Sequence, residues 1–571
     1  MQHDIGDHAL LADSRTAALI DPEGNVAWMC WPRVDSPPLL FSILDETRGG
    51  CFSVRPAAPL GRPTRAYHAS TLVLQTRWAV AGGTLIAEDA LLLRSGPALV
   101  RRVRAEGCEV EVEVRFGCAG RLLAQANTLD VAARTRLHLV SAAPWTVSEG
   151  SAVSRFTVAA GEEFAVILAA PGSANVADID GDISTWRRHS SGAARLTPST
   201  LAAASSDVMA IRDTAATSIC VILGLAQHGG GIVAAPTTSL PQWPGSGRTW
   251  DYRFCWMRDA ALAGVALTHV GQVEAAHTLG DFLGGAVMEH GVRPVYRVDG
   301  GLPAEEAKQP RLAGYRGARP VRFGNAAAAQ AQLDAPAELM ELVWALAAHG
   351  HVPSALAAAA TMCADWIADH WREPDHGIWE IRGPARHYTH SRAMACMALR
   401  GAADLSARGV LRGNDSAWRG AADAVGREIR PAASGALELH RDGGGADAAL
   451  ALVSHVGFLP AEDPLNVRTL QLLRERLDRN GLLERYEGTP DAIPDPCHPF
   501  VFPTFWMAEA AAAAGMDGAR HLRAAFATRG ALNLFGEVAN PGDHSAQGNY
   551  PQVQSHAAFL IASTEGVATG K

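Results

Sequence analysis

Two glutamates in this sequence could carry out acid–base chemistry on a sugar. Glu380 directly follows Trp379, within the stretch 375–383 that separates two Ala-rich helical segments. A carboxyl group that donates a proton near neutral pH needs a raised pKa, and an adjacent apolar ring favours this because it displaces water from the ionised form. Glycoside hydrolysis pairs such an acid with a second carboxylate, for which Glu537 in the segment 534–538 is the candidate. The alternative for Glu380 is a carboxylate that only balances a helix dipole.

The composition describes a globular protein with more than one core. The chain has 571 residues, of which 48% are apolar and 19% charged, so it exceeds one ordinary domain. The net charge of -9, without any basic block, gives no basis for a nucleic-acid partner. The start, residues 1–4, lacks a signal-peptide pattern, and no apolar run reaches the roughly 18 residues of a membrane span. We therefore expect a cytoplasmic protein with no membrane partner.

The cysteines, histidines and glycines give no sign of a metal or phosphate site. The nine cysteines are scattered without a Cys-x-x-Cys pair, which is typical of reduced core thiols. His387 and His390 have an i, i+3 spacing, but no Cys or carboxylate set completes a metal site, so we expect hydrogen-bonding histidines and no metal. Gly229–Gly231 lacks the pattern of a phosphate-binding loop. The acidic stretch 299–306 predicts a mobile loop rather than a catalytic one.

The first part of the chain, to about residue 204, has the pattern of a β-sandwich. The apolar runs 16–20 and 26–31 flank the turn sequence Asp-Pro-Glu-Gly-Asn, which predicts a hairpin. Residues 109–116 alternate charged and apolar side chains, which predicts a half-buried strand. Short strands with turn signals between them favour two packed sheets.

From about residue 205 onward the apolar residues recur with helical spacing. Within 339–346 they stand at i, i+3, i+4 and i+7, and Gly350 follows where a helix would end. Loops rich in Gly, Pro, Asp and aromatic residues separate such runs, which favours a closed ring of paired helices whose loops line a pocket. The further helix-like runs are 260–290, 353–371, 389–408, 416–428, 464–479, 502–514 and 552–563.

Motifs in these loops together resemble glycoside hydrolase family 15, the family of glucoamylases, glucodextranases and bacterial trehalases. They are RTWDYRFCWMRDA at 248–260, GYRGARPVRFGNA at 314–326, GIWE at 377–380, RHYTHS at 386–391 and GNYPQ at 548–552. The segments IGDH at 5–8 and WPRVDSP at 31–37 resemble the N-terminal β domain of the bacterial, trehalase-like members.

The resemblance implies a multidomain β plus α fold. A β-supersandwich over residues 1–204 would precede an (α/α)6 barrel catalytic domain over residues 205–571. It also implies inverting hydrolysis of α-glucosidic bonds from a non-reducing end, with Glu380 as general acid and Glu537 as general base. In such enzymes the two carboxyl groups lie about 6.5–9.5 Å apart, which leaves room for the attacking water.

The resemblance also implies a set of sugar-binding residues. Arg258 and Asp259 match the pair that grips hydroxyls of the terminal glucose, through a forked donor and a charged acceptor. The alternative for this pair is a local salt bridge at a helix start. The other candidates are Trp256 and Trp379 as apolar faces, Tyr252 and Tyr315 as hydrogen-bonding rims, and Arg319, Arg322 and Arg485 as further contacts. For the aromatic residues the alternative is core packing, and for Arg319 and Arg322 it is bracing of their own loop.

The sequence departs from the family pattern in three places. Gly536 and Val538 replace the polar neighbours that usually flank the base, so either the activation of the attacking water would be weaker or its orientation would depend on another residue. Residues 333–338 lack a usual aromatic. Residues 491–499 contain three prolines in place of an acidic, Gly-rich segment. The last two changes bear on the shape of the pocket and therefore on the choice of substrate.

We predict an exo-acting, inverting α-glucoside hydrolase with a small carbohydrate substrate and no cofactor. Trehalase-like action on a glucosyl disaccharide is the first choice, and glucoamylase or glucodextranase action on oligosaccharides is the second. The alternatives from other classes are an inverting phosphorylase on the same barrel and a carbohydrate-binding protein without turnover. The sequence leaves the oligomeric state open, a homo-oligomer included.

Overall fold

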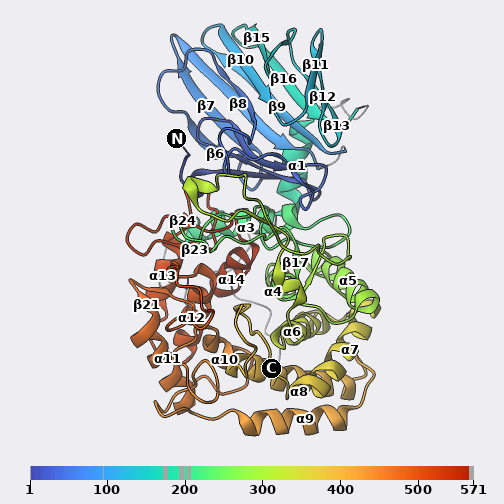
Figure 1. Ribbon diagram of the computed structural model, residues 1–571, viewed down its shortest axis with the longest axis vertical. Coiled ribbons are helices and arrows are strands. Elements are labelled where there is room, and N and C mark those ends of the chain that lie inside the picture. The colour runs from blue at the N-terminus through green and yellow to red at the C-terminus, as the bar shows by residue number, and fades with distance from the viewer. Residues whose placement is uncertain are drawn as a thin grey trace.

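The computed structural model describes residues 2–93, 96–171, 178–191, 199, 202 and 207–564. A β-sheet domain from the N-terminal part of the chain sits on one end of a helical domain (Figure 1). Helix α3 (Val208–Leu225) lies at the junction and contacts the first strand of the β domain. The predicted boundary between residues 204 and 205 falls outside the described residues.

Antiparallel sheets build the N-terminal domain. The strands are β1 (Ala9–Ala12), β2 (Ala17–Ile20), β3 (Val26–Cys30), β4 (Pro38–Leu40), β5 (Cys51–Pro56), β6 (Thr64–Tyr67), β7 (Leu74–Val80), β8 (Gly83–Leu91), β9 (Ala98–Glu106), β10 (Val110–Gly117), β11 (Arg121–Gln125), β12 (Thr128–Ala132), β13 (Arg136–Val140), β14 (Thr146–Ser148), β15 (Ser151–Val158) and β16 (Glu163–Ala169). The sheet orders are β1-β2-β3-β4, β14-β15-β10-β5 and β11-β12-β13-β16-β9-β8-β7-β6. Helix α1 (Ile179–His189) follows the last strand.

The predicted hairpin and the predicted strand are both confirmed. The hairpin is β2 and β3, in which Ala18 lies opposite Met29. The strand is β10, which pairs with β15 on one side and β5 on the other. The β-sandwich pattern of the sequence therefore marks the correct part of the chain.

The helices of the second domain form a closed double ring. They are α3, α4 (Met257–His269), α5 (Val273–His290), α6 (Asp334–Ala348), α7 (Ser354–His370), α8 (Thr389–Ala407), α9 (Asp415–Glu428), α10 (Leu452–His455), α11 (Pro464–Leu477), α12 (Val501–Ala513), α13 (Ala519–Ala527) and α14 (Val553–Ser563). Helices α4, α6, α8, α10, α12 and α14 contact one another in turn, and α14 returns to α4. The remaining helices pack around this inner ring.

The burial of the helices matches their place in the double ring. Every residue of the inner helix α14 is buried, whereas the outer helix α9 buries only Trp418, Ala422 and Val425. A helix that is apolar all round belongs inside, and one with a single apolar stripe covers a surface. Helix α3 is long and apolar enough to cross a membrane, but 67% of it is buried inside the protein, as in a core helix.

The helix-like run 260–290 is two helices rather than one. Helix α4 ends at His269, and Gly271 with a φ of 74° turns the chain into α5. Glycine adopts this left-handed conformation without the steric cost that a Cβ would add. The continuous apolar spacing across the turn hid the break, because both helices turn apolar faces to the same core.

Short pairs of strands connect the helices and hold the loops of the second domain. These are β17 (Cys255–Trp256) with β18 (Val295–Tyr296), β19 (Ala307–Lys308) with β20 (Arg322–Phe323), β21 (Asp478–Arg479) with β22 (Leu482–Leu483), and β23 (Val538–Ala539) with β24 (Ala546–Gln547). Strand β17 leads directly into α4, so it fixes the position of the first turn of that helix.

Candidate active site

A cavity lies among the loops that connect the inner helices. Its walls come from the residues before and within the first turns of α4, α12 and α14, and from the turn 378–382 between α7 and α8. The N-terminal ends of helices carry partial positive charge, which favours carboxylates and sugar oxygens at such a place. Arg258, Asp259 and Glu380 all line this cavity.

A tight turn places the carboxylate of Glu380 in the wall. Its backbone has a φ of 54°, which is unusual for a residue with a side chain, and its N–H donates to the Gly377 carbonyl at 3.1 Å. The Gln330 amide nitrogen donates to the Glu380 carbonyl at 3.2 Å. Oε1 accepts the Trp256 indole N–H at 2.5 Å and an Arg258 N–H at 3.2 Å. Oε2 has no protein partner in the described part of the chain, so a proton on it would face the cavity.

Arg258 is the centre of a buried group of carboxylates. Its Nε lies 3.3 Å from Asp259 Oδ2, its Nη1 lies 3.7 Å from Asp334 Oδ2, and its Nη2 contacts Glu380. Burial raises the pKa of Asp259 to about 6 and that of Asp334 to about 7, although the guanidinium opposes both shifts. The same carboxylates raise the pKa of Arg258, which therefore stays charged. An arginine at a helix start opposes the helix dipole, and these carboxylates compensate for it.

Glu537 is fully buried directly before β23, behind the cavity wall that Tyr252 forms. Its Oε1 accepts the Tyr252 hydroxyl at 2.6 Å and the Gln242 amide at 2.6 Å, and its Oε2 accepts the Asn549 backbone N–H at 3.2 Å. Burial raises the pKa of Glu537, whereas these hydrogen bonds and the charge of Arg485 lower it. Glu537 itself is not among the residues that line the cavity, but Tyr252 is.

Two aromatic side chains lie between the two glutamates. The Tyr252 hydroxyl is bonded to Glu537, and the Trp256 indole is bonded to Glu380. The two rings meet edge to face with their centroids 5.5 Å apart. The structure therefore links the two predicted carboxylates through a tyrosine and a tryptophan, with Glu380 in the cavity wall and Glu537 buried behind Tyr252.

Other predicted residues divide between the cavity and its surroundings. Trp379 and Arg485 line the cavity. Trp379, however, donates its indole N–H to Asp447 at 2.7 Å, and the indole that donates a hydrogen bond to Glu380 is that of Trp256. The ring bonded to Glu380 therefore comes from another loop, whereas the role of Trp379 as an apolar neighbour of Glu380 stays a prediction.

The structure places Tyr315, Arg319 and Arg322 outside the cavity lining. The Tyr315 hydroxyl donates to the His3 carbonyl at 2.9 Å, in the N-terminal segment. Arg319 is exposed and donates to the Ala313 carbonyl at 3.1 Å within its own loop. Arg322 is buried and donates to both oxygens of Thr249. Their placement gives no support to the predicted sugar contacts. It matches the alternative of loop bracing for the two arginines and that of core packing for Tyr315, which is 3% exposed.

Sequence reasoning missed several cavity residues. Trp250 stands in the 248–260 motif and Arg382 stands two residues after Glu380, so both were within reach of a motif-based search. Glu306, in the loop predicted to be mobile, forms ion pairs with Arg322 and with Arg382. That loop is therefore fastened to the cavity wall.

The predicted histidine contacts hold only in part. His387 accepts from Arg392, whereas neither ring nitrogen of His390 has a hydrogen-bond partner among the described protein atoms. Burial lowers the pKa of His390 to about 3, so it stays neutral. No cluster of three or more His, Cys, Asp and Glu side chains within the described ranges has the arrangement of a metal site.

Known proteins share both the sequence pattern and the fold. The family model for "Glycosyl hydrolases family 15" matches residues 212–569, and that for "Trehalase-like, N-terminal" matches residues 2–128. A trehalase of Mycobacterium tuberculosis is 29% identical over 98% of this chain and 89% of its own length. Trehalase 1 of Sulfolobus acidocaldarius is 28% identical over 97% of each chain. A bacterial glucoamylase solved with acarbose covers 98% of this chain and 94% of its own, with a TM-score of 0.70 at 13% identity, which shows the shared fold.

Proposed function

This chain belongs to glycosyl hydrolases family 15, and we propose that it is an exo-acting α-glucosidase that inverts the anomeric configuration and acts in the manner of a trehalase. It is a glycoside hydrolase, and its substrate is a carbohydrate. The observation that carries the proposal is the pair of glutamates joined through Tyr252 and Trp256, with Glu380 in the cavity wall and Glu537 behind Tyr252. Two intervening aromatic side chains suit the wide spacing of an inverting enzyme better than the about 5–5.5 Å of a retaining one.

The proposed reaction is a single displacement. Arg258 and Asp259, at the deep end of the cavity, hold hydroxyls of the terminal glucose through charged hydrogen bonds. Glu380 donates the proton on Oε2 to the glycosidic oxygen as the bond to the anomeric carbon breaks. A water attacks that carbon from the opposite face, and Glu537 takes its proton. The products of an α-linked substrate are β-glucose and the leaving-group sugar.

The choice of trehalose as substrate is supported by the relatives. Trehalases match this chain almost from end to end, its β domain included. The second candidate is hydrolysis of α-gluco-oligosaccharides, which the shared fold with a bacterial glucoamylase favours. We further propose a cytoplasmic location, which the nine free cysteines support because reduced thiols are typical of that compartment.

The proposal is tested with purified enzyme on trehalose, maltose, isomaltose, kojibiose and nigerose, with glucose as the measured product. We expect trehalose to give the highest kcat/KM and β-glucose to appear first by polarimetry. Glu380→Gln should lower kcat by about 10²- to 10⁴-fold while sugar binding persists, because the amide fills the same space but donates no acidic proton. Glu373→Gln, an exposed glutamate just before the same turn, is the matched control.

The alternatives have their own outcomes in the same assay. First appearance of α-glucose would rule out inversion. Glucose release that requires inorganic phosphate, with glucose 1-phosphate as a product, would identify a phosphorylase. Sugar binding without release of glucose from any of the disaccharides would identify a binding protein.

A further inference from the structure

The cavity has a closed end and an open end, and Glu380 lies between them. Arg258 and Asp259 are 6% and 2% exposed, whereas 20% of the Glu380 side chain and 28% of the Arg382 side chain are accessible. If the terminal glucose occupies the closed end, the leaving group must lie toward the open end. The general acid touches the bond between the two sugars, so residues beyond Glu380 on the open side would contact the leaving group. This step rests on the proposed hydrolase function.

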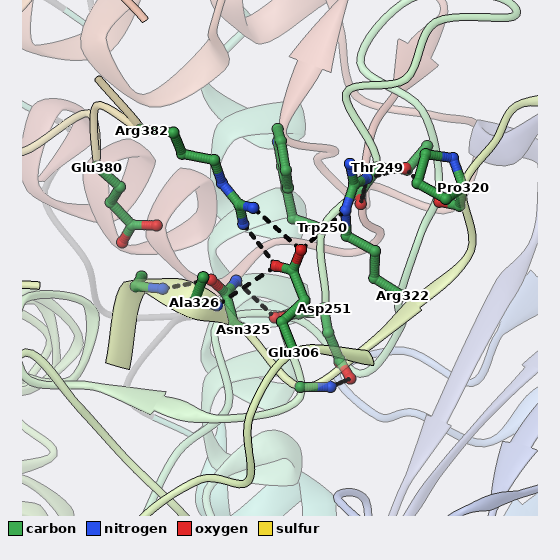
Figure 2. A network of polar contacts seen from close by, with 12 residues as sticks. Thr249, Trp250, Asp251, Glu306, Pro320, Arg322, Asn325, Ala326, Glu380 and Arg382 are labelled. Atoms are coloured by element: carbon green, nitrogen blue, oxygen red, sulfur yellow. Dashed lines mark hydrogen bonds and ion pairs between the residues drawn. The ribbon is translucent and has the colours of Figure 1, made fainter. Parts of the chain in front are cut away.

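Arg382 lies on the open side of the cavity, beyond Glu380. It follows the acid by two positions, and Gln330 holds the intervening carbonyl groups of Glu380 and Ile381 at 3.2 and 3.4 Å. The Arg382 guanidinium is therefore tied to the backbone turn that positions the acid. Figure 2 shows the Arg382 side chain between Glu380 and Trp250.

A stack of three planar groups fixes the orientation of Arg382. The Arg382 guanidinium carbon lies 4.1 Å from the centroid of the Trp250 ring, and that of Arg322 lies 4.5 Å from it. Figure 2 shows the indole between the two guanidinium groups. Since both indole faces are covered by arginine, Trp250 cannot serve as a stacking platform for a sugar. The free face of Arg382, together with the indole edge, forms the cavity wall.

Glu306 binds both arginines at once. Its carboxylate accepts two N–H groups of Arg382, at 3.0 and 2.6 Å, and the Nε of Arg322 at 3.1 Å (Figure 2). The Ala326 backbone N–H donates to the same carboxylate at 3.3 Å. Because its side chain is only 12% exposed, solvent screens these contacts less than it would at an open surface. The remaining N–H groups of Arg382 can donate to hydroxyls of a bound sugar.

We propose that Arg382, stacked on Trp250 and fastened by Glu306, forms the binding subsite for the leaving-group sugar. Arg382 contacts that sugar, and Glu306 is a positioning residue that acts through Arg382. The ligand is a polyhydroxyl ring, because the N–H groups of Arg382 that Glu306 does not use can donate to hydroxyls, while Glu306 offsets one of the two guanidinium charges. A preorganised donor of this kind favours a glucosyl leaving group over one without hydroxyls.

The test compares a substrate that has a sugar leaving group with one that lacks it. Trehalose and α-glucosyl fluoride share the terminal glucose, but fluoride can make no contact with Arg382. For Arg382→Met, which keeps the length of the side chain and loses the guanidinium, we expect the ratio of kcat/KM for trehalose to that for the fluoride to fall about tenfold. Glu306→Gln should lower the same ratio about threefold, chiefly through KM, because the arginine stays but loses its fastening.

Asp299→Asn is the matched control. Asp299 lies in the same loop and pairs with Arg33 and Arg297 at 2.8 and 3.1 Å, away from the cavity. It should leave the ratio unchanged. A ratio that is also unchanged in Arg382→Met, whether both substrates slow alike or neither does, would overturn the subsite. A wild-type enzyme that hydrolyses the fluoride but no disaccharide would instead overturn the proposed function.

Discussion

At the scale of residues, the proposed base illustrates how distant side chains replace missing neighbours. The sequence lacks polar groups beside Glu537, with Gly536 and Val538 in their places. In the folded protein Tyr252 and Gln242, nearly three hundred positions earlier, donate to the same carboxylate oxygen. The ionised form of Glu537 is therefore stabilised by groups that no local pattern reveals.

Removing one of these donors should change the pH dependence of the reaction. Burial raises the pKa of Glu537 and the Tyr252 hydroxyl lowers it, so Tyr252→Phe should raise that pKa further. A base acts only when ionised, and activity falls as pH drops through its pKa. The acidic limb of the kcat/KM profile should therefore move to higher pH, with about a tenfold loss of kcat at pH 7. The measurement is the pH profile on trehalose.

Tyr486→Phe provides the control for this prediction. Tyr486 also donates its hydroxyl to a buried carboxylate, Asp491, at 2.6 Å. The substitution is chemically the same but concerns a carboxylate with no proposed part in proton transfer. The acidic limb of the kcat/KM profile of Tyr486→Phe should coincide with that of the wild type. An acidic limb that stays in place in Tyr252→Phe would contradict the role of Glu537 as base.

The sequence motifs contain the residues proposed to carry the chemistry, but they do not identify the partners of those residues. Glu380, Arg258 and Asp259 were found because their types and spacing are characteristic, and they line one cavity. Tyr315 stands in an equally characteristic motif but contacts the N-terminal segment. A motif identifies a loop, whereas the direction of each side chain depends on how other parts of the chain pack against that loop. A single sequence does not show which distant parts these are.

At the scale of elements, the turn between α7 and α8 controls the position of Glu380, the proposed acid. Gly377 has a φ of 63°, and a Cβ placed on it would lie 2.9 Å from the Tyr388 ring. Its carbonyl accepts the Glu380 N–H and its own N–H donates to Asp375. Any side chain at this position would therefore strain the turn.

Gly377→Ala should impair catalysis through geometry alone. The left-handed backbone costs about 1 kcal/mol for alanine, and the contact with Tyr388 adds about 1–3 kcal/mol. Relief of this contact would displace Glu380, so kcat should fall at least about tenfold. Gly350→Ala is the control, since Gly350 has a φ of 89° and open space around its Cβ position. Gly350→Ala should lower the free energy of unfolding only by the cost of the left-handed backbone, and its kcat should equal that of the wild type.

The sequence predicted where helices and strands lie better than it predicted the residues at which they begin and end. Periodicity located the strands of the hairpin and most helices, because an element with one buried face needs apolar residues at regular positions along the sequence. It joined α4 and α5 across Gly271, since the apolar spacing continues through the turn. Periodicity also did not predict that the loop around Glu306 is held by ion pairs with Arg322 and Arg382. Ion pairs between loops leave no periodic signal.

At the scale of the whole molecule, the β domain supports the loop that carries Tyr252 and Trp256. Strand β3 contributes Trp28, whose indole N–H donates to the Pro236 carbonyl at 2.8 Å. The Arg253 guanidinium lies 5.8 Å from the centroid of the Trp28 ring and donates to the Ser36 carbonyl at 2.8 Å. These contacts join the two domains directly behind the cavity.

Because of this junction, we expect the two domains to unfold as one unit. Calorimetry of the wild type should show a single transition, and Trp28→Ala should destabilise the whole protein by about 3–5 kcal/mol. The variant should also lose kcat/KM at temperatures where it is folded, although Trp28 does not line the cavity. Trp78→Ala, in strand β7 and equally buried, should lower the unfolding temperature without that kinetic loss. The prediction would be wrong if calorimetry showed two separate transitions and Trp28→Ala left the unfolding temperature of the helical domain unchanged. The β domain would then not support the loop that carries Tyr252 and Trp256.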